Sequence, residues 1–555
     1  MNVLRHAKWL IVVTLLINAA AMFSPIINGG DSITYAALSQ HIALNNDWGN
    51  LLLDGQDWLD KPHFPFWVTA LFFKLGGSSA FTYILPGFLF HLIGGYFTYR
   101  IARLLHNRNV AWLAVFVYVS VYHLMDSSIE VKAETYLTGC IMAACYYWLR
   151  YDAALKLKYL LLGALFSALA VMTKGVFTLI TIASGLVCVW LYQRQWRKLW
   201  SGKWLLALFL SLLFTFPEII SLYLQFDAHP EKLVFGQTQL SGIRFFLWDS
   251  QFGRFFNTGP IQNHNGNPSY FVLVFLWAFL PWVAVFIAAL YSGIRHFTAS
   301  SSSDKSGLVY LCGSFFITFA LFSATSFQLD HYTVILFPFA AILCAKFLND
   351  WVVKQDTGGV LYYMQLGILL LLVSLPVALS LYVGNAFLLT VVLFLSAVLL
   401  MYIYRTRGQR QLGAVMYPVI GINILFVFIS WMSALTFIKY DVAYHAAKVI
   451  GERPSLPVYL HQMPLQAREL GLYLQTPCFS IDDLKQLDQT KGDFLLILKK
   501  SDVPQLSQRY AQFQQLSLMQ LVIHKTGTFP KLLKMAKGIW PLEDITILQI
   551  NQPAV

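Results

Sequence analysis

Long apolar stretches recur along the whole chain and constrain its fold more than any other feature of the sequence. A helix needs roughly 20 mostly apolar residues to cross the hydrocarbon core of a bilayer. Thirteen stretches are predicted to do so: 9–27, 64–98, 110–125, 135–149, 157–173, 175–193, 204–224, 269–293, 308–325, 332–349, 360–383, 386–404 and 413–438. Only 12% of the residues are charged, against about 25% in a typical soluble domain. The sequence therefore predicts a polytopic α-helical membrane protein and excludes a soluble enzyme, a disordered chain and a fibrous repeat.

Two of the apolar regions contain internal breaks. Lys74 and Gly76-Gly77 interrupt the stretch 64–98, which predicts a short interfacial helix followed by one span. Lys174-Gly175 separates the two spans predicted between residues 157 and 193.

Basic residues collect in seven alternate loops between the predicted spans. They are Arg5 and Lys8; Arg100, Arg103 and Arg108; Arg150, Lys156 and Lys158; Arg194, Arg197, Lys198 and Lys203; Arg295 and Lys305; Lys346 and Lys354; and Arg405, Arg407 and Arg410. The positive-inside rule places these loops and the N-terminus in the cytoplasm, and thirteen spans then place the C-terminus outside. The net charge of +12 is thereby explained by topology, so no nucleic-acid partner is implied.

The first apolar stretch also has features of a signal peptide. Arg5 and Lys8 form a basic start, and Ala19-Ala20-Ala21 resembles a cleavage site. A membrane span is favoured because the apolar run continues to Ile27, which is long enough to cross a bilayer.

The composition changes at Tyr440, which divides the chain into a transmembrane domain, 1–439, and a C-terminal domain, 440–555. The second part is more charged, and from Leu456 short strand and helix patterns alternate, which predicts a small α/β domain on the external side. Its single cysteine, Cys478, cannot form a disulfide framework.

The long external loop 28–63 carries the first group of charges that could support chemistry. Asp31 follows Gly29-Gly30 directly after the first span, so it is a candidate base or metal ligand, or else the N-cap of the next helix. Asp60-Lys61-Pro62 places an acid beside a cation at the start of the next apolar stretch. The alternative for this pair is an interfacial contact with a snorkelling lysine.

Further charges follow at other external turns. Glu130 and Glu134 are four residues apart and could bind a divalent ion, with Lys132 facing a phosphate, although a solvated turn is an equal alternative. Lys174, between two apolar spans, is either an interfacial anchor or a phosphate contact.

The second long external loop, 225–268, and the turn after it complete the set. Arg244 and Arg254 are candidates for a bidentate phosphate contact. The other candidates are Asp249, His264, His331 and Tyr332, and a lone histidine is more often structural than a ligand. Charges that converge on one membrane surface indicate an enzyme, whereas a channel or transporter places them along a path through the spans.

With these residues in order, the chain resembles the GT-C membrane glycosyltransferases that use polyprenyl-phosphate sugars. The closest branch is the aminoarabinose transferases, which are related to the protein O-mannosyltransferases. The residues that carry the resemblance are Asp31 with Tyr35-Ala36, Asp60-Lys61-Pro62, Thr173-Lys174-Gly175, Trp248-Asp249, Arg254-Phe255, Pro281-Trp282, and Tyr332 with Pro338. The resemblance covers nearly the whole chain and rests on the ordered set rather than on one motif.

The resemblance implies a role for individual residues. Asp31 corresponds to the essential aspartate of the first loop. Lys61, Tyr332 and Lys174 correspond to residues that contact the lipid-linked donor, and Glu134 matches an important acid at the start of the fourth span, with Lys132 as the preceding basic residue.

Two positions depart from the family pattern. Thr34 stands where family members often carry an arginine, three residues after the first aspartate. Members that bind a divalent metal near the phosphate use a glutamate and loop histidines, but here the acid is Asp60 and the segment 248–251 has no histidine. A metal site in this chain would consist of Asp60 and His264.

These residues together predict an inverting glycosyltransferase at the periplasmic face of a bacterial inner membrane. Asp31 would take the proton of the acceptor hydroxyl, while Lys61, Lys174 and Arg254 would stabilise the polyprenyl phosphate that leaves. The expected partners are the polyprenyl-phosphate sugar, membrane lipids and an acceptor, which is a glycolipid such as lipid A or, alternatively, a protein. The alternative from another class is a flippase for a lipid-linked sugar, for which no internal repeat is found.

Overall fold

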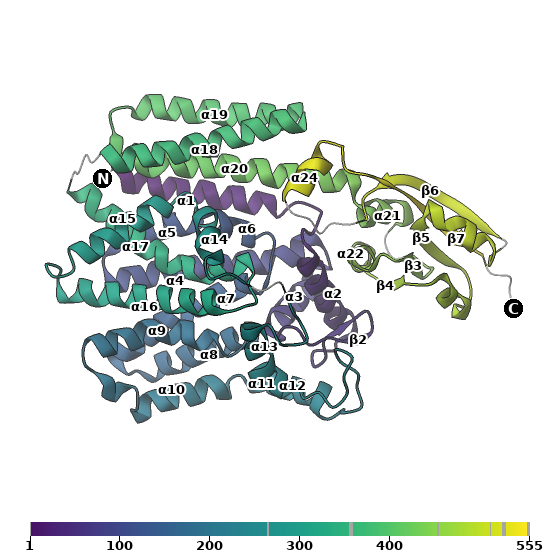
Figure 1. Ribbon diagram of the computed structural model, residues 1–555, viewed down its shortest axis with the longest axis horizontal. Coiled ribbons are helices and arrows are strands. Elements are labelled where there is room, and N and C mark those ends of the chain that lie inside the picture. Colours follow the sequence, from purple (N-terminus) through teal and green to yellow (C-terminus); the bar gives the residue numbers. More distant parts are fainter. Residues whose placement is uncertain are drawn as a thin grey trace.

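The structure is a computed structural model that describes residues 2–263, 266–354, 359–451, 454–510, 512–523 and 529–551. A helical bundle carries a smaller mixed domain at one end, and the N-terminus lies at the other end (Figure 1). The long bundle helices are α1 (Asn2–Ala21), α4 (Ala80–Leu105), α5 (Arg108–Val119), α7 (Ala133–Ala154), α8 (Leu157–Lys174), α9 (Thr178–Tyr192), α10 (Gly202–Leu213), α14 (Tyr270–Ala278), α15 (Val283–Arg295), α16 (Ser302–Ala324), α17 (Phe337–Val353), α18 (Gly359–Val383), α19 (Ala386–Thr406) and α20 (Arg410–Tyr440).

All thirteen predicted spans coincide with a single helix or with two or three consecutive helices. Within the described residues, nine helices are long and apolar enough to cross a membrane, or ten if the bent pair of α14 and α15 is included. A multi-pass helical membrane protein is therefore confirmed, whereas the number of thirteen crossings stays a prediction. The breaks at Gly76-Gly77 and Lys174-Gly175 fall as predicted, since α3 (Phe64–Gly76) ends before α4 and α8 ends before α9.

One predicted span is sharply bent. The stretch 269–293 forms α14 and α15, whose axes are bent by 112°. The break contains Pro281, which lacks an N–H group and cannot continue the hydrogen-bond ladder of a helix. Pro281 therefore explains why this stretch forms two helices instead of one.

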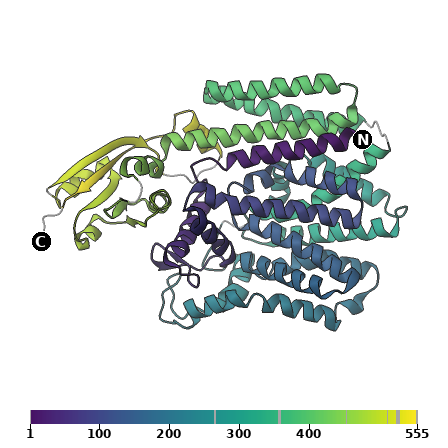
Figure 2. The ribbon, with the colours of Figure 1, turned by 180° about the vertical axis from the view of Figure 1, so that it is seen from behind.

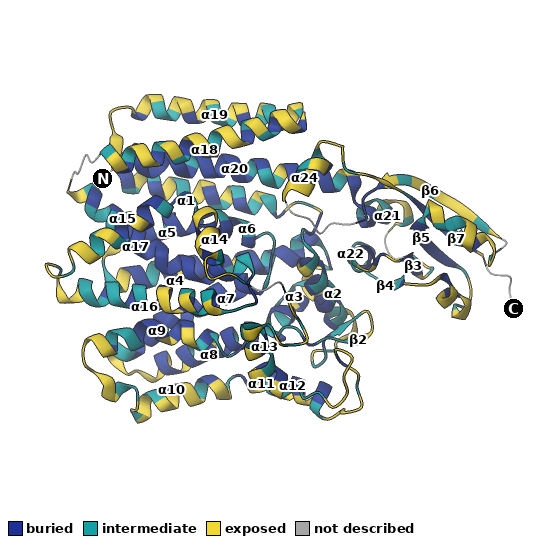
Figure 3. Ribbon diagram, viewed as in Figure 1, coloured by how far each residue is buried: buried dark blue, intermediate teal, exposed yellow. Residues whose placement is uncertain are grey.

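Burial distinguishes the centre of the bundle from its lipid-facing edge. In the segment Asp330–Val353, which includes α17, 83% of the span is buried, whereas only 17% is buried in α19, although α19 is the more apolar of the two (Figure 3). Apolar side chains are exposed on α18 and α19. They suit contact with lipid tails, because the hydrocarbon core contains no water that would make their exposure unfavourable. From behind, α1 lies along α20, and α20 continues toward the smaller domain (Figure 2).

Shorter elements form the end of the bundle that faces the smaller domain. They are α2 (Gly30–Asn45), β1 (Leu52–Leu53), β2 (Gln56–Asp57), α3, α6 (Tyr122–Ser127), α11 (Phe216–Leu222), η2 (Tyr223–Asp227), α12 (Gly242–Arg244), η3 (Phe245–Asp249), α13 (Ser250–Phe256) and η4 (Asp330–Leu336). A further short helix, η1 (Trp196–Lys198), lies between α9 and α10.

The C-terminal part is built around a five-stranded sheet with strand order β4-β3-β5-β7-β6. Its elements are α21 (Val442–Ile450), β3 (Val458–His461), α22 (Pro464–Leu474), β4 (Cys478–Ile481), η5 (Leu484–Gln489), β5 (Phe494–Lys499), η6 (Lys500–Asp502), α23 (Val503–Ser507), β6 (Phe513–Leu521), α24 (Phe529–Ala536) and β7 (Glu543–Ile550). The central strand β5 is parallel to β3 and antiparallel to β7. The predicted α/β character is confirmed.

Alternation along β5 explains why this strand is almost wholly apolar. Leu495 and Ile497 enter one hydrophobic cluster, and Phe494, Leu496 and Leu498 enter another. Successive side chains of a strand point to opposite faces, so a strand covered on both faces must be apolar at every position.

Candidate active site

Six charged or phenolic side chains that were predicted to act together converge at the end of the bundle nearest the smaller domain. Asp31 lies in the first turn of α2, Lys61 in the loop after β2, Glu134 in the first turn of α7, and Lys174 in the last turn of α8; Arg254 lies in α13 and Tyr332 in η4. Every one comes from an element end or a loop, where a rigid scaffold can present polar groups without burying a charge in lipid.

Asp60 lies between two cations. Lys61 Nζ is 2.5 Å from one carboxylate oxygen of Asp60, and the guanidinium of Arg254 forms an ion pair with the other. Burial alone would raise the pKa of Asp60, but Lys61 and Arg254 outweigh burial and lower it. Burial and the neighbouring Arg254 lower the pKa of Lys61. One carboxylate therefore holds two cations, which leaves a positive charge available for a second anion.

Lys174 and Glu134 form a buried ion pair beside the first group. Their side chains are 6% and 3% exposed, and the ammonium of Lys174 lies 3.7 Å from the centre of the Tyr332 ring. His331 Nε2 is 3.6 Å from a carboxylate oxygen of Glu134. These contacts compensate for much of the cost of burying the two charges and keep the ammonium facing the phenol.

Lys132, also predicted to face a phosphate, pairs with a different acid. Its ammonium lies 2.8 Å from Glu130 Oε1. Glu130 and Glu134 do not share a helix, because α7 begins at Ala133. Burial opposes the charge of Lys132, but Glu130 raises its pKa overall. The two acids thus hold different lysines and do not form one divalent-ion site.

Asp31 is not the N-cap of α2. Gly29 occupies the N-cap position with φ of 87°, and the helix starts at Gly30. A Cβ at Gly29 would lie 2.7 Å from Glu130 Oε1, so this position requires glycine for both space and conformation. The Asp31 side chain is exposed, and among the described residues no hydrogen bond or ion pair holds its carboxylate. A free carboxylate of this kind can accept a proton from a substrate.

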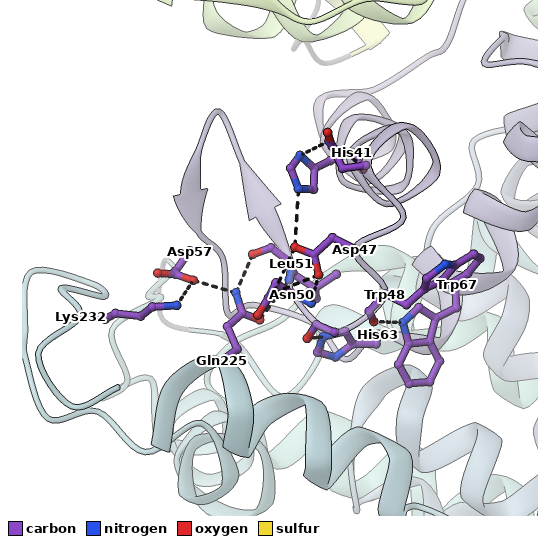
Figure 4. A network of polar contacts seen from close by, with 12 residues as sticks. His41, Asp47, Trp48, Asn50, Leu51, Asp57, His63, Trp67, Gln225 and Lys232 are labelled. Atoms are coloured by element: carbon purple, nitrogen blue, oxygen red, sulfur yellow. Dashed lines mark hydrogen bonds and ion pairs between the residues drawn. The ribbon is translucent and has the colours of Figure 1, made fainter. Parts of the chain in front are cut away.

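The first external loop is attached to η2 and to the loop that follows η2 by a network of polar contacts (Figure 4). The amide of Gln225 accepts from the Leu51 N–H and donates to the Leu51 carbonyl, both at 3.0 Å. The same amide nitrogen donates to Asp57 Oδ1 at 2.9 Å, and Lys232 pairs with that oxygen at 3.0 Å. These contacts fix the loop that carries Asp60 and Lys61.

A buried pair, His63 and Glu218, holds the end of the same loop. The backbone N–H of His63 donates to Glu218 Oε2 at 3.0 Å, and His63 Nδ1 is 2.9 Å from Glu218 Oε1. Both side chains are fully buried. Sequence reasoning missed this pair, although an acid such as Glu218 within an apolar stretch is the signal that would have indicated it.

A small cavity of about 20 Å³ is lined by Asp60, Lys61, Lys174 and Arg254. Two larger cavities border the site. The first, of about 370 Å³, is lined mostly by apolar residues of α9, α13 and α16, including Ile180, Phe256 and Leu321, and it also contacts Lys174 and Arg254. The second, of about 560 Å³, lies between α1, α20 and α24. Its wall includes Gly29-Gly30, directly before Asp31, together with Asp126 and Glu130. The segment just before Asp31 therefore borders one of the larger cavities, while Lys174 and Arg254 border the other.

Two further candidates are not placed in this cluster. Asp249 pairs with the exposed Arg244 at 3.3 Å, and His264 lies outside the described residues. Among the residues that the structure describes, no three His, Cys, Asp or Glu side chains are grouped to hold a metal ion. Asp60 is already neutralised by Lys61 and Arg254, so the described donors do not fit a divalent ion.

The pKa of Asp126 predicts a pH-dependent contribution to stability. Burial and the neighbouring Glu130 raise this pKa from 3.8 to about 7. Between these values the folded protein binds the proton more strongly than the unfolded chain, so this contribution is present at low pH and is lost as the pH rises toward 7. We expect Asp126→Asn, which cannot ionise, to gain in Tm relative to the wild type as the pH rises over this interval. A Tm difference between variant and wild type that stays the same across this interval would contradict the assignment.

Comparisons with known proteins were made for the whole chain. The family model for dolichyl-phosphate-mannose-protein mannosyltransferases matches residues 60–220. The undecaprenyl phosphate-alpha-4-amino-4-deoxy-L-arabinose arabinosyl transferase 2 of Proteus mirabilis is 24% identical over 328 residues, and the corresponding transferase of Edwardsiella ictaluri is 26% identical over 327 residues. Each match covers 58% of this chain and 55% of the relative, so the chain matches little more than half the length of these curated relatives.

A solved structure matches almost the entire chain. The crystal structure of ArnT from Cupriavidus metallidurans bound to undecaprenyl phosphate superimposes with a TM-score of 0.71 and 17% identity, over 97% of both chains. The chain has the GT-C fold of ArnT. The same enzyme in the apo state matches with a TM-score of 0.69. The resemblance to ArnT seen in the sequence is therefore confirmed, including its C-terminal domain.

Proposed function

We propose that the protein is a glycosyltransferase that uses a polyprenyl-phosphate sugar at the periplasmic face of a bacterial inner membrane. One observation carries the proposal: Lys174, Arg254 and Tyr332 line the same cavity as the apolar residues of α9, α13 and α16, which form an apolar groove. An isoprenoid chain fits the apolar part, and the cations suit the phosphate at its end. The names of the matched transferases support undecaprenyl phosphate as the carrier.

The proposed reaction is direct displacement at the anomeric carbon. Asp31 accepts the proton of the acceptor hydroxyl as that oxygen forms the new glycosidic bond. The bond from the anomeric carbon to the phosphate oxygen breaks, and Lys61, Arg254 and Lys174 stabilise the charge on the polyprenyl phosphate. Attack opposite the leaving group inverts the anomeric configuration. A phosphate leaves without a general acid, so one free carboxylate is sufficient.

The acceptor is proposed to enter from the second cavity. Its wall combines apolar residues such as Phe437 and Trp540 with the acids Asp126 and Glu130 and the cation of Lys531. A molecule with acyl chains and a polar head suits such a wall, so a glycolipid such as lipid A is the favoured acceptor. The mannosyltransferase model, which matches residues 60–220, supports a protein as the second candidate acceptor.

Mass spectrometry of the cell envelope tests the proposal. Lipids and proteins are compared between cells that express the wild type and cells that express Asp31→Asn at the same level. We expect one glycolipid species that is heavier by one sugar residue in the first cells only. Identical lipid and protein spectra would refute the proposed function, and a mass change confined to proteins would assign the second acceptor.

The groove makes a separate prediction about the length of the donor lipid. Leu321→Trp narrows the groove, so the KM for a long-chain polyprenyl donor is expected to rise about tenfold, with little change for a short isoprenoid donor. Leu308→Trp on the same helix, α16, is the matched control because Leu308 lines a different cavity. An equal effect on long and short donors would show that the groove does not hold the lipid tail.

A further inference from the structure

Helix α22 of the C-terminal domain lies directly against helix α2, whose first turn carries Asp31. The side chain of Gln40 in α2 donates to the Gly471 carbonyl at 2.8 Å. At the other end of the contact, the Tyr473 hydroxyl donates to the Pro25 carbonyl at 3.0 Å. The C-terminal domain is therefore in contact with the segments that precede and follow the candidate base.

Arg468 of α22 contacts α2 close to Asp31 in the sequence. Its Nε and Nη2 both donate to Asp54 Oδ2, at 2.9 and 2.6 Å, and Nη1 donates to the hydroxyl of Thr34 at 3.3 Å. The arginine side chain is 18% exposed. One guanidinium thus joins a residue of α2 to a residue of the first external loop.

The two residues that Arg468 joins have a defined relation to the site. Thr34 is three residues after Asp31, so both lie on the same side of α2. Asp54 occupies the tight turn between β1 and β2, with φ of 53°, in the loop that leads to Asp60 and Lys61. The contact therefore connects the helix of the candidate base with the loop of the candidate phosphate-binding lysine.

We propose that Arg468 is a positioning residue that sets Asp31 relative to the phosphate-binding cations, and that the C-terminal domain thereby completes the active site. The inference rests on the proposed function for its catalytic consequence. The guanidinium is planar and offers several donors in a fixed fork, so it holds two partners in one geometry, which a flexible ammonium does not. A displacement of about 1 Å between reacting groups can lower a rate about a hundredfold.

Steady-state transfer kinetics test the proposal on the full-length enzyme in lipid nanodiscs. We expect Arg468→Ala to lower kcat tenfold to about a hundredfold, with the KM for the donor within about twofold of the wild type, because substrate contacts are unchanged. Arg468→Lys should lose most of the same activity. Asp54→Asn should resemble Arg468→Ala, and the double variant should show little further loss, because the two residues act through one contact.

Arg509→Ala is the matched control. Arg509 pairs with Asp488 at 2.6 Å within the same domain, so its removal takes away an arginine–aspartate pair that does not join α2 to the first loop. We expect wild-type kcat for this variant. A wild-type kcat for Arg468→Ala, or an equal loss for both alanine variants, would overturn the proposal.

Hydrogen exchange supplies a readout that needs no substrate. The amides of residues 30–36 are expected to exchange about tenfold faster in Arg468→Ala than in the wild type, and at the wild-type rate in Arg509→Ala. Unchanged exchange in Arg468→Ala would overturn the proposal even if kcat fell. A wild-type protein that transfers no sugar would refute the proposed function instead, and the exchange experiment would then decide alone whether Arg468 holds the first turn of α2.

Discussion

Asp31→Asn is expected to lower kcat for sugar transfer by about 10²–10⁴-fold, because it removes the group that accepts the proton of the acceptor hydroxyl. Asn has the same size and cannot accept that proton, so binding of the donor should be retained. The measurement is transfer of a labelled sugar from polyprenyl phosphate by the purified variant, together with its Tm. Asp31 is exposed and makes no ion pair in the described chain, so the Tm should stay close to that of the wild type.

Asp482→Asn is the control for this substitution, since Asp482 is an exposed aspartate of the C-terminal domain. It should retain wild-type turnover. Near-normal turnover by a well-folded Asp31→Asn variant would contradict the role of Asp31 as the base.

Lys174→Met is expected to reduce both activity and stability. Loss of a cation that stabilises the leaving phosphate should lower kcat by about 10²–10³-fold. The substitution also leaves Glu134 as an uncompensated buried charge, and breaking a buried pair in this way costs about 3–5 kcal/mol of unfolding free energy. Transfer kinetics and thermal unfolding of the variant measure the two effects separately.

A double variant separates the two roles of Lys174. Lys174→Met with Glu134→Met replaces the buried pair by apolar side chains, so the Tm should return toward that of the wild type. The kcat should stay low because the cation is still absent. Recovery of transfer in the double variant would show that Lys174 serves only to neutralise Glu134 and does not act on the phosphate.

Local sequence signals predicted the membrane part of the fold well, because each span is specified by its own residues. The glycines at 76–77 and Lys174-Gly175 marked helix ends that the structure contains. Pro281 was visible within the stretch 269–293, but its consequence, a bend of 112°, depends on how α14 and α15 pack. In the C-terminal domain, β7 gives only a weak strand signal, because its eight residues begin with two acids and mix polar with apolar positions.

The candidate site was predictable as a set of residues but not as a set of contacts. Asp60 and Arg254 were both singled out, yet nothing in the sequence indicated that they pair with each other across 194 positions. The partner of Glu134 was likewise open until α7 and α8 were seen side by side. Arg468 carries no signal at all, since an arginine in a predicted helix is ordinary until its partners Asp54 and Thr34 are known.

Sugar transfer by the purified protein in liposomes tests the central claim most directly. The liposomes contain a labelled polyprenyl-phosphate sugar and a glycolipid acceptor with a free hydroxyl or phosphate group. The account predicts that the label moves to the glycolipid with inverted anomeric configuration, and that Asp31→Asn abolishes this transfer. Movement of the labelled donor from one leaflet to the other, with no label on any acceptor, would show a flippase and contradict the account.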